Sequence, residues 1–464
     1  MAAVEVSDTT ATRIFDRNYR LPVIGIIAVV TVVAIEAMAV TTVMPTVVRS
    51  LDGLRYYSWG FTAYLLADVV GMVDAGRRTD RDGPTPSLVG GMTIFAVGLV
   101  VAAVAPDIWV FLVGRVLQGV GGGSMIVPLY VVVARALPES LHGTAFALMS
   151  AAWVVPSLIG PGLAGLVAST VGWRWVFGGI APLAVAGVLT LVPVLRAVGS
   201  DHRAPDEARQ AARGGLVTGI RVALGLAAVQ EAAQLASWVS IPMLVAAGAI
   251  AVPPLVRLLP AGAFRSSHGL GTVMVLRAAV TCAFFGAEAY LPLTLTQLHG
   301  GTPRTVGIPL TIASLGWSAG SWWQGRRNHG RVTSLQLGFI ALACGIGLLL
   351  LVAQPSTSLW LAIPIWTVAG TGIGLVMPIV SVLVLELSPA AEQGANSAAI
   401  QLADITGSIV GIASVAALVN GLGLHHFTLA VSVGDAVLAT VALCAAALAH
   451  RIESRRGMPA ATAA

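Results

Sequence analysis

Residues 21–48 read LPVIGIIAVVTVVAIEAMAVTTVMPTVV, an apolar stretch with a single charged residue, Glu36. At 1.5 Å per residue, a helix of this length extends about 42 Å. The hydrocarbon core of a bilayer is about 30 Å thick, so such a helix crosses it with residues to spare. This stretch therefore predicts a membrane-spanning helix. Residues 1–20 are polar and are expected to form a cytoplasmic segment before it.

The composition of the whole chain agrees with this first stretch. Apolar residues make up 56% of the 464 residues and charged residues 10%, and the mean hydropathy is +0.87. A soluble domain carries about 25% charged residues. We therefore expect an integral protein of a lipid bilayer and exclude soluble metabolic enzymes and DNA-binding factors. The net charge of +5 comes from arginines between apolar stretches, so no nucleic-acid partner is expected.

Further apolar stretches follow along the chain, and each one predicts a helix that crosses the bilayer. They are too long for the strands of a membrane barrel and lack the alternation of such strands. The fold class that we expect is therefore all-α. The predicted spans number fourteen and lie at 21–48, 57–75, 87–105, 108–134, 143–168, 177–197, 215–236, 239–257, 271–298, 305–324, 333–353, 358–386, 394–420 and 427–449.

The arginines give these spans an orientation. The 26 basic residues are all arginine, and with fourteen spans 19 of them fall on one side, 4 on the other and 3 within spans. Short cytoplasmic loops carry an excess of positive charge. The distribution therefore predicts that both termini are cytoplasmic, in a protein that crosses the bacterial plasma membrane many times.

The chain contains an internal repeat. Residues 71–78 and 320–327 both follow the pattern G-x4-G-R-R, and the second glycines, Gly76 and Gly325, are 249 residues apart (325 − 76). Offsets of 250 to 252 also relate Pro128 to Pro378, Gly143 to Gly394 and Glu36 to Glu288. Parallel repeats of membrane helices are typical of transporters that hold a substrate between two halves.

The repeat predicts the organisation of the chain. Six helices form each half, and the two remaining helices connect the halves. The expected parts are the cytoplasmic segment 1–20, a first six-helix bundle at 21–198, a polar cytoplasmic linker at 199–214, two linker helices at 215–258, a second six-helix bundle at 271–450 and a cytoplasmic tail at 451–464.

Four short patches have the residue types and spacing of transporter motifs. The first runs from Glu36 to Pro45, an acid nine residues before a proline. The second is the loop Gly76–Gly83, with Asp80 and Arg81. The other two lie within predicted helices: Arg115, Gln118 and Gly119 in one, and Gly160, Pro161 and Gly165 in the next.

Together these patches resemble the major facilitator superfamily and, within it, the fourteen-helix drug:proton antiporters. The resemblance implies roles for particular residues. Glu36 and Arg115 would take part in proton coupling, and the loop with Asp80 and Arg81 would latch the two halves on the cytoplasmic face. The patch around Pro161 resembles a signature of exporters. The implied activity is export of hydrophobic or cationic small molecules in exchange for protons.

Charged residues inside the predicted spans need a partner or a water-filled cavity, and five of them are candidates for a functional role. From the position of each in its helix, Glu36 and Arg115 lie at nearly the same depth. They would form a pair or share water, and Glu36 would carry a proton whose affinity depends on Arg115. A purely structural ion pair is the alternative. Glu288 lies at a similar depth and would be a second proton site or the anchor of a cationic substrate. Asp68 and Asp404 are expected near the midplane, with a role for Asp404 in proton coupling. The alternative is that either residue faces a wet cavity and is merely solvated there.

Aromatic and polar side chains are candidates for the substrate cavity. They are Trp153, Phe285, Tyr290 and Trp317, together with Asp68 and Gln401. The alternative for the aromatic residues is an interfacial position, which Trp and Tyr often occupy in membrane proteins.

The sequence shows no ATPase motif, catalytic triad or metal-ligand cluster, so we expect no enzyme and no cofactor, with protons as the coupling ion and a monomeric chain. Two alternatives stay open. One is a dedicated exporter of one endogenous lipid or metabolite, and the other is a membrane receptor or scaffold that transports nothing, because a fold alone does not determine function.

Overall fold

The structure is a computed structural model, and it describes residues 14–16, 19–198, 206–235, 239–259, 269–326, 330–389 and 392–452. These residues form fourteen α-helices and a few short 3-10 segments, without a strand, which confirms the all-α prediction. The helices are α1 (Arg20–Ser50), α2 (Trp59–Asp82), α3 (Pro84–Ala103), α4 (Ile108–Ala136), α5 (Glu139–Thr170), α6 (Arg174–Val198), α7 (Asp206–Leu235), α8 (Ser240–Leu258), α9 (Leu270–His299), α10 (Pro303–Arg326), α11 (Arg331–Val352), α12 (Ala362–Leu387), α13 (Gln393–Leu422) and α14 (Phe427–Leu448).

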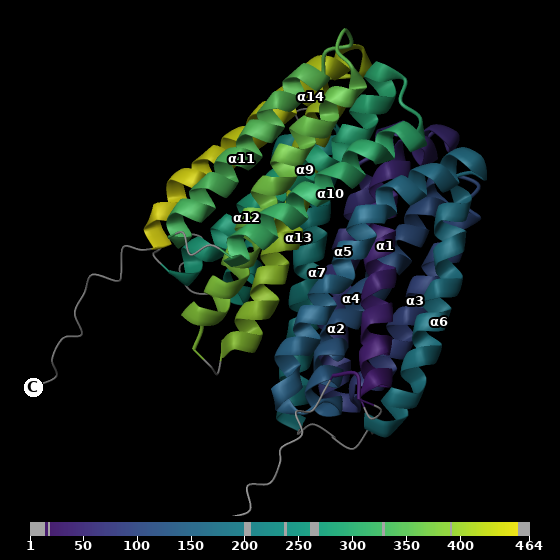
Figure 1. Cartoon of the computed structure of the whole chain (residues 1–464), viewed down its shortest axis with the longest axis vertical. Coiled ribbons are helices and arrows are strands. Elements are labelled where there is room, and N and C mark those ends of the chain that lie inside the picture. The colour runs from purple at the N-terminus through teal and green to yellow at the C-terminus, as the bar shows by residue number, and fades with distance from the viewer. Residues whose placement is uncertain are drawn as a thin grey trace, which may run out of the picture.

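Helices α1–α6 form one bundle and α9–α14 a second, and the two share one packing pattern (Figure 1). In the first bundle α1 packs on α5 and α6, α4 packs on α2 and α3, and α3 packs on α6. The second bundle repeats each of these contacts between helices numbered eight higher: α9 packs on α13 and α14, α12 packs on α10 and α11, and α11 packs on α14. The internal repeat that the sequence predicts is thus present in the helix packing.

Glycines bring the helices at the centre of each bundle into close contact. A Cβ atom at Gly119 or Gly123 of α4 would collide with a backbone carbonyl oxygen of α2. Gly370 and Gly374 of α12 face α10 in the same way. Small residues permit such close approach between membrane helices. The glycine-rich run in α4 is therefore explained by packing.

Ten of the described helices are long and apolar enough to cross a membrane. The other four are α2, α7, α8 and α10. Helix α2 carries Asp68 and Asp74 within its length, and α8 has only 19 residues.

Helix α7 begins at Asp206, inside the linker predicted at 199–214. The helix therefore includes part of the segment that we expected to be a linker. Residues 199–205, 1–13 and 453–464 of the predicted linker and cytoplasmic ends lie outside the described residues.

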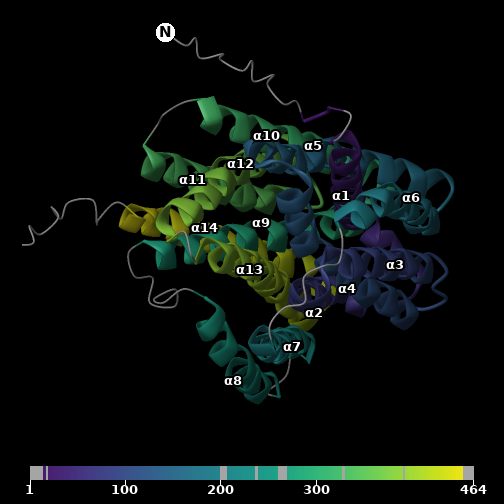
Figure 2. The ribbon, with the colours of Figure 1, turned by 90° about the horizontal axis from the view of Figure 1, so that it is seen from below.

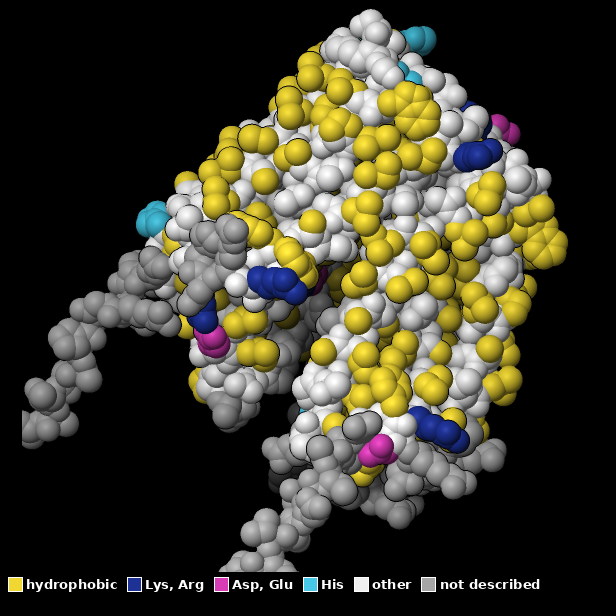
Figure 3. Space-filling model, viewed as in Figure 1, with side chains coloured by type: hydrophobic (Ala, Val, Ile, Leu, Met, Phe, Trp, Pro, Cys, Tyr) yellow, Lys and Arg dark blue, Asp and Glu magenta, His cyan; other side chains and the backbone are white. Residues whose placement is uncertain are grey.

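The two bundles meet at one end and diverge at the other (Figure 1). The end with residues 50–59 and 299–303 is closed, and we call it the closed end. The open end holds the start of α1, and there a cleft separates the bundles (Figure 3). On one face of the closed end, α5 packs directly on α10. On the other face α7 lies between α2 and α13, with α8 outside it (Figure 2).

Buried amides join the bundles at the closed end. Gln230 and Gln234 of α7 each donate a hydrogen bond to the Ser58 Oγ at the start of α2, both at 2.7 Å. The Asn420 Nδ2 of α13 donates to the Gln234 Oε1 at 2.6 Å. The side chains of Ser58, Gln230 and Gln234 are all buried. Helix α7 is therefore a polar link between the two bundles.

This link predicts that Gln234→Leu will favour opening of the closed end. The change removes two buried hydrogen bonds, each worth about 0.5–1.5 kcal/mol. The measurement is the rate of maleimide labelling of Leu293→Cys, a buried residue beside the link, in purified protein with Cys344 and Cys444 replaced by serine. We expect the rate to rise by about fivefold or more, as a shift of about 1 kcal/mol requires. Gln354→Leu, at an exposed position, is the control and will leave the rate unchanged. Equal rates in both variants would show that the amides do not hold this end shut.

Candidate functional site

Glu36 and Arg115 form a buried ion pair in the first bundle. The Arg115 Nη1 donates to the Glu36 Oε1 and to the Gln118 Oε1, and its Nε donates to the Gly60 carbonyl at 2.8 Å. Glu36 is fully buried and Arg115 is 3% exposed. The predicted proximity of these two residues is thereby confirmed, while their role in proton coupling stays a prediction.

The surroundings of this pair hold the arginine more firmly than the acid. The Tyr64 ring lies 4.8 Å from the Arg115 guanidinium carbon, and Gln118 is itself held by a 3.0 Å bond from its Nε2 to the Gly98 carbonyl. The Glu36 Oε2 is buried and has no hydrogen-bond partner among the described residues. One carboxyl oxygen is therefore bound to a cation while the other is free to carry a proton.

The repeat places a different set of side chains around Glu288 in the second bundle. Gly119 of α4 and Gly370 of α12 pack alike, so they occupy equivalent positions in the two bundles. The residues four positions before them, Arg115 and Trp366, are therefore equivalent as well. Gly123 packs on the Asp68 carbonyl and Gly374 on the Trp317 carbonyl, so Asp68 corresponds to Trp317. The second bundle thus has tryptophans where the first has an arginine and an aspartate.

Glu288 is partly buried and has no hydrogen-bond or ion-pair partner within the described ranges. One helical turn before it, Phe284 stacks on Trp366 with the ring centroids 4.9 Å apart. Phe284 also contacts Phe285 and Trp317 edge-on, at 5.3 and 5.5 Å. Of the predicted cavity residues, Phe285 and Trp317 thus belong to one aromatic cluster, which we define as Phe284, Phe285, Trp317 and Trp366.

Asp404 forms an ion pair that the sequence analysis did not anticipate. The Arg277 Nη2 of α9 donates to the Asp404 Oδ2 of α13 at 2.7 Å, and the Arg277 Nη1 donates to the Ser381 Oγ of α12 at 3.0 Å. The charge of Asp404 is met by an arginine 127 residues away in sequence, and its role in proton coupling stays a prediction.

The patch around Pro161 lies where the two bundles touch. A Cβ at Gly165 would collide with the Pro303 carbonyl of α10, and the Pro161 carbonyl lies 2.5 Å from the position of a Cβ at Gly307. Gly160 faces inward, with Met38 of α1 3.0 Å from its Cβ position. These small residues let α5 and α10 close one face of the molecule.

The residues predicted to form a loop at Gly76–Gly83 are instead the last turns of α2, which continues to Asp82, and they do not join the bundles in this structure. Arg81 pairs with the adjacent Asp82 at 2.6 Å, and Arg78 pairs with Asp74 at 2.6 Å. Asp80 is exposed and has no partner in the part of the chain that the structure describes, and Gly76 faces open space, with Val127 4.0 Å away. Gly83 has a φ of 80°, which favours glycine, and ends the helix. A latch between the halves is not formed here, because these residues lie at the open end.

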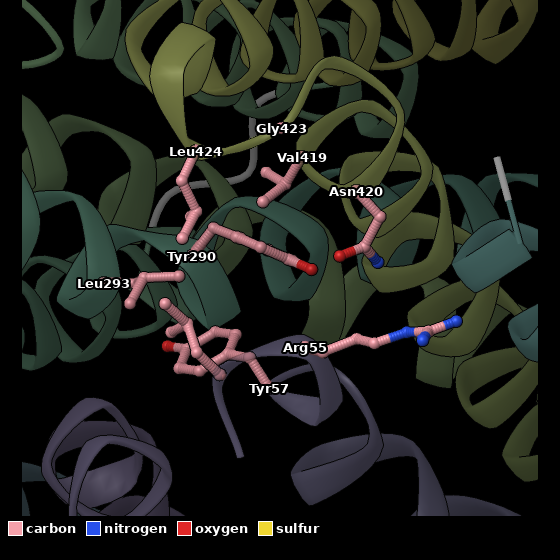
Figure 4. Close-up of a pocket in the computed structure, with 9 residues that line it drawn as sticks. Arg55, Tyr57, Tyr290, Leu293, Val419, Asn420, Gly423 and Leu424 are labelled. Carbon is pink, nitrogen blue, oxygen red and sulfur yellow. The ribbon is translucent and has the colours of Figure 1, made fainter. Parts of the chain in front are cut away.

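Three predicted cavity residues lie apart from the aromatic cluster. Trp153 is 39% exposed, and Gln401 is partly exposed. Tyr290 is buried at the closed end, where it lines a pocket of about 160 Å³ with Arg55, Tyr57 and Asn420 (Figure 4). The Tyr57 hydroxyl donates to the Ala289 carbonyl at 2.5 Å. Ligand pockets start at about 300 Å³, so this one is too small for a drug-sized substrate.

The sequence reasoning missed Ser58, Gln230, Gln234 and Asn420. A signal was present, because Gln230 and Gln234 are two amides one helical turn apart in the stretch 222–235, where Glu231 is the one other polar residue. Amides on one face of a membrane helix indicate a polar contact with a neighbour. We expected α7 to connect the two halves and did not predict a polar contact for it.

Comparison with known proteins agrees with this arrangement. A probable multidrug-efflux transporter of Mycobacterium tuberculosis is 28% identical over 399 residues, which cover 82% of this chain and 83% of the relative. The transporter of the acurin A biosynthesis cluster of Aspergillus aculeatus is 28% identical over 365 residues, covering 74% and 65%.

A crystal structure of an auto-inhibited peptide transporter of the POT family superposes with a TM-score of 0.69 over 96% of this chain and 98% of the other. The two are 16% identical in sequence, so this likeness concerns the fold alone. The family model described as Major Facilitator Superfamily matches residues 26–412. This chain is therefore a member of the Major Facilitator Superfamily, a family of membrane transporters.

Proposed function

We propose that this protein is a proton-coupled exporter of hydrophobic or cationic small molecules, working by alternating access across the bacterial plasma membrane. All fourteen helices would span the membrane with both termini in the cytoplasm, as the arginine distribution supports. The cleft then opens to the cytoplasm, because it lies at the end where α1 begins (Figure 3). Substrate would enter there and leave after the closed end opens.

The observation that carries this proposal is the buried Glu36–Arg115 pair with its free carboxyl oxygen. A proton on the Glu36 Oε2 would neutralise the acid and weaken its attraction to Arg115. Removing the proton would restore the ion pair. If the outward-open and inward-open states differ in how they hold this pair, they differ in proton affinity, and coupling requires such a difference.

The second bundle supports a cationic substrate. Glu288 lacks the arginine that its counterpart Glu36 has, and the aromatic cluster lies one helical turn away. An unpaired carboxylate beside aromatic faces attracts a lipophilic cation through charge and cation–π contacts. We propose that protons bind in the first bundle and that substrate binds at Glu288 in the second.

A dedicated exporter of one metabolite is the second candidate. It is favoured by the relative from the acurin A biosynthesis cluster, whose name ties it to a single biosynthetic product. The relative named as a multidrug-efflux transporter covers more of this chain, and therefore multidrug export is the first candidate. A panel of chemically unrelated cationic dyes separates the two, since only a multidrug exporter would move several of them.

Glu36→Gln tests the proton carrier. In inverted membrane vesicles with an imposed pH gradient, we expect ethidium uptake to fall by at least about tenfold, since the variant cannot exchange a proton at this position. Glu231→Gln, the same change in α7 away from the cleft, is the control and will keep wild-type uptake. Uptake by Glu36→Gln at the wild-type rate would exclude Glu36 as the carrier.

Glu288→Gln tests the substrate anchor. We expect the KM for ethidium to rise by about tenfold or more with little change in the maximal rate, because the lost charge contributes to binding. Transport of an uncharged hydrophobic substrate will change by less than about twofold. The measurement is uptake kinetics for both substrates in the same vesicles. Equal losses for the charged and the uncharged substrate would contradict a role in cation recognition.

A further inference from the structure

A proton on Glu36 has no direct way to the cleft in this conformation. Glu36 is fully buried, and its free oxygen is enclosed by protein. Asp68 of α2 is partly exposed, and it has no hydrogen-bond or ion-pair partner in the part of the chain described. It lies eight residues after Gly60, the residue that binds Arg115, which places it about 12 Å further along α2 towards the open end.

Asp68 lies on the inner side of α2. Leu66 and Val69 of the same helix pack in one apolar cluster with side chains of α7, α8 and α13, on the side of α2 that faces α7. With 100° between successive residues, Asp68 points away from that cluster. Its backbone carbonyl contacts Gly123 and its carboxyl group lies over Gly122, so the residue faces α4.

Tyr64 stands between the two acids. It lies one turn of α2 before Asp68, and its ring lies against the Arg115 guanidinium, which is paired with Glu36. The Tyr64 side chain thus connects the ion pair with the partly exposed acid.

The Tyr64 hydroxyl and the Asp68 carboxyl group both lie close over Gly122 of α4. The position of a Cβ on Gly122 is 2.5 Å from the Tyr64 Oη and 3.5 Å from the Asp68 Oδ1. The two oxygens are therefore no more than about 6 Å apart, the sum of those distances. A single water with two hydrogen bonds of about 2.8 Å spans nearly this distance.

We propose that Asp68 is the residue that releases the coupling proton to the cleft, receiving it from Glu36 by way of the Tyr64 hydroxyl and a bridging water. The O–H bond on the Glu36 Oε2 breaks once that oxygen comes into hydrogen-bond contact with the Tyr64 hydroxyl, a contact that this conformation does not make. The tyrosine accepts that proton and donates its own to the bridging water, the water passes one on, and an O–H bond forms on Asp68. Tyr64 ends unchanged and no electrons are transferred. Glu36 returns to its ion pair with Arg115, and Asp68 passes the proton to water.

This inference rests on the proposed function and assigns Asp68 to proton release, although the sequence analysis placed it in the substrate cavity. The two roles differ in what a variant loses. A substrate residue affects every mode of transport, whereas a release residue affects only transport that moves protons. Exchange of internal for external substrate at equal pH needs no proton release.

The test uses the purified full-length protein in proteoliposomes, with ethidium as the probe. Two rates are measured: uptake driven by a pH gradient, and counterflow of ethidium at equal pH. For Asp68→Asn we expect gradient-driven uptake to fall by at least about tenfold and counterflow to stay within about twofold of the wild type. Asp68→Glu, which keeps a proton acceptor, will restore most of the uptake. Asp435→Asn, the same loss of charge in α14, is the matched control.

Two further variants keep the test valid if Asp68→Asn does not fold. Tyr64→Phe keeps the ring against Arg115 and removes only the hydroxyl, and Gly122→Ala displaces that hydroxyl, which lies 2.5 Å from the position of the added Cβ. Both will reduce gradient-driven uptake and spare counterflow. Unchanged uptake in all three variants, or equal loss of uptake and counterflow, would overturn the assignment of Asp68. A wild type that shows counterflow but no response to the pH gradient would instead refute proton coupling itself, and the release step with it.

Discussion

The close approach of α4 to α2 is the contact on which the site depends. Because Gly119 and Gly123 lack side chains, the backbones touch along several turns. This contact brings the Gly60 carbonyl to the Arg115 Nε, and the arginine is then turned towards Glu36 on α1. A charged guanidinium within a membrane is costly unless it is paired and hydrogen-bonded. The glycines therefore determine where a charge is tolerated as well as how the helices pack.

The closed end is held differently on its two faces. On one face, backbone contacts at Gly165 and Gly307 bring α5 directly onto α10. On the other, α7 fills the space between α2 and α13 and binds both through buried amides. Apolar contact is not directional, whereas an amide network breaks when its members move apart. The linker helices thus contribute specific geometry to the contact between the halves.

Much of the fold could be predicted from the sequence, because apolar length and repeated glycine patterns are local signals. The equal depth of Glu36 and Arg115 could be predicted by counting residues along two helices, because the rise per residue of a helix is constant. The pair of Arg277 with Asp404 could not be found in this way, because it depends on how α9 and α13 are rotated against each other. The approach of the Tyr64 hydroxyl to Asp68 over Gly122 could not be predicted either, because it depends on the rotamer of Tyr64.

The tryptophans that replace charged residues in the second bundle bear on how such a chain arises by duplication. Two identical copies would place an arginine beside both acids, or beside neither. A symmetric dimer of the first half would carry two ion pairs and no aromatic cluster, and a dimer of the second half would carry the reverse. Fusion into a single polypeptide allows the halves to diverge while both remain present in a one-to-one ratio. The covalent connection therefore preserves an asymmetry that no homodimer of either half could have.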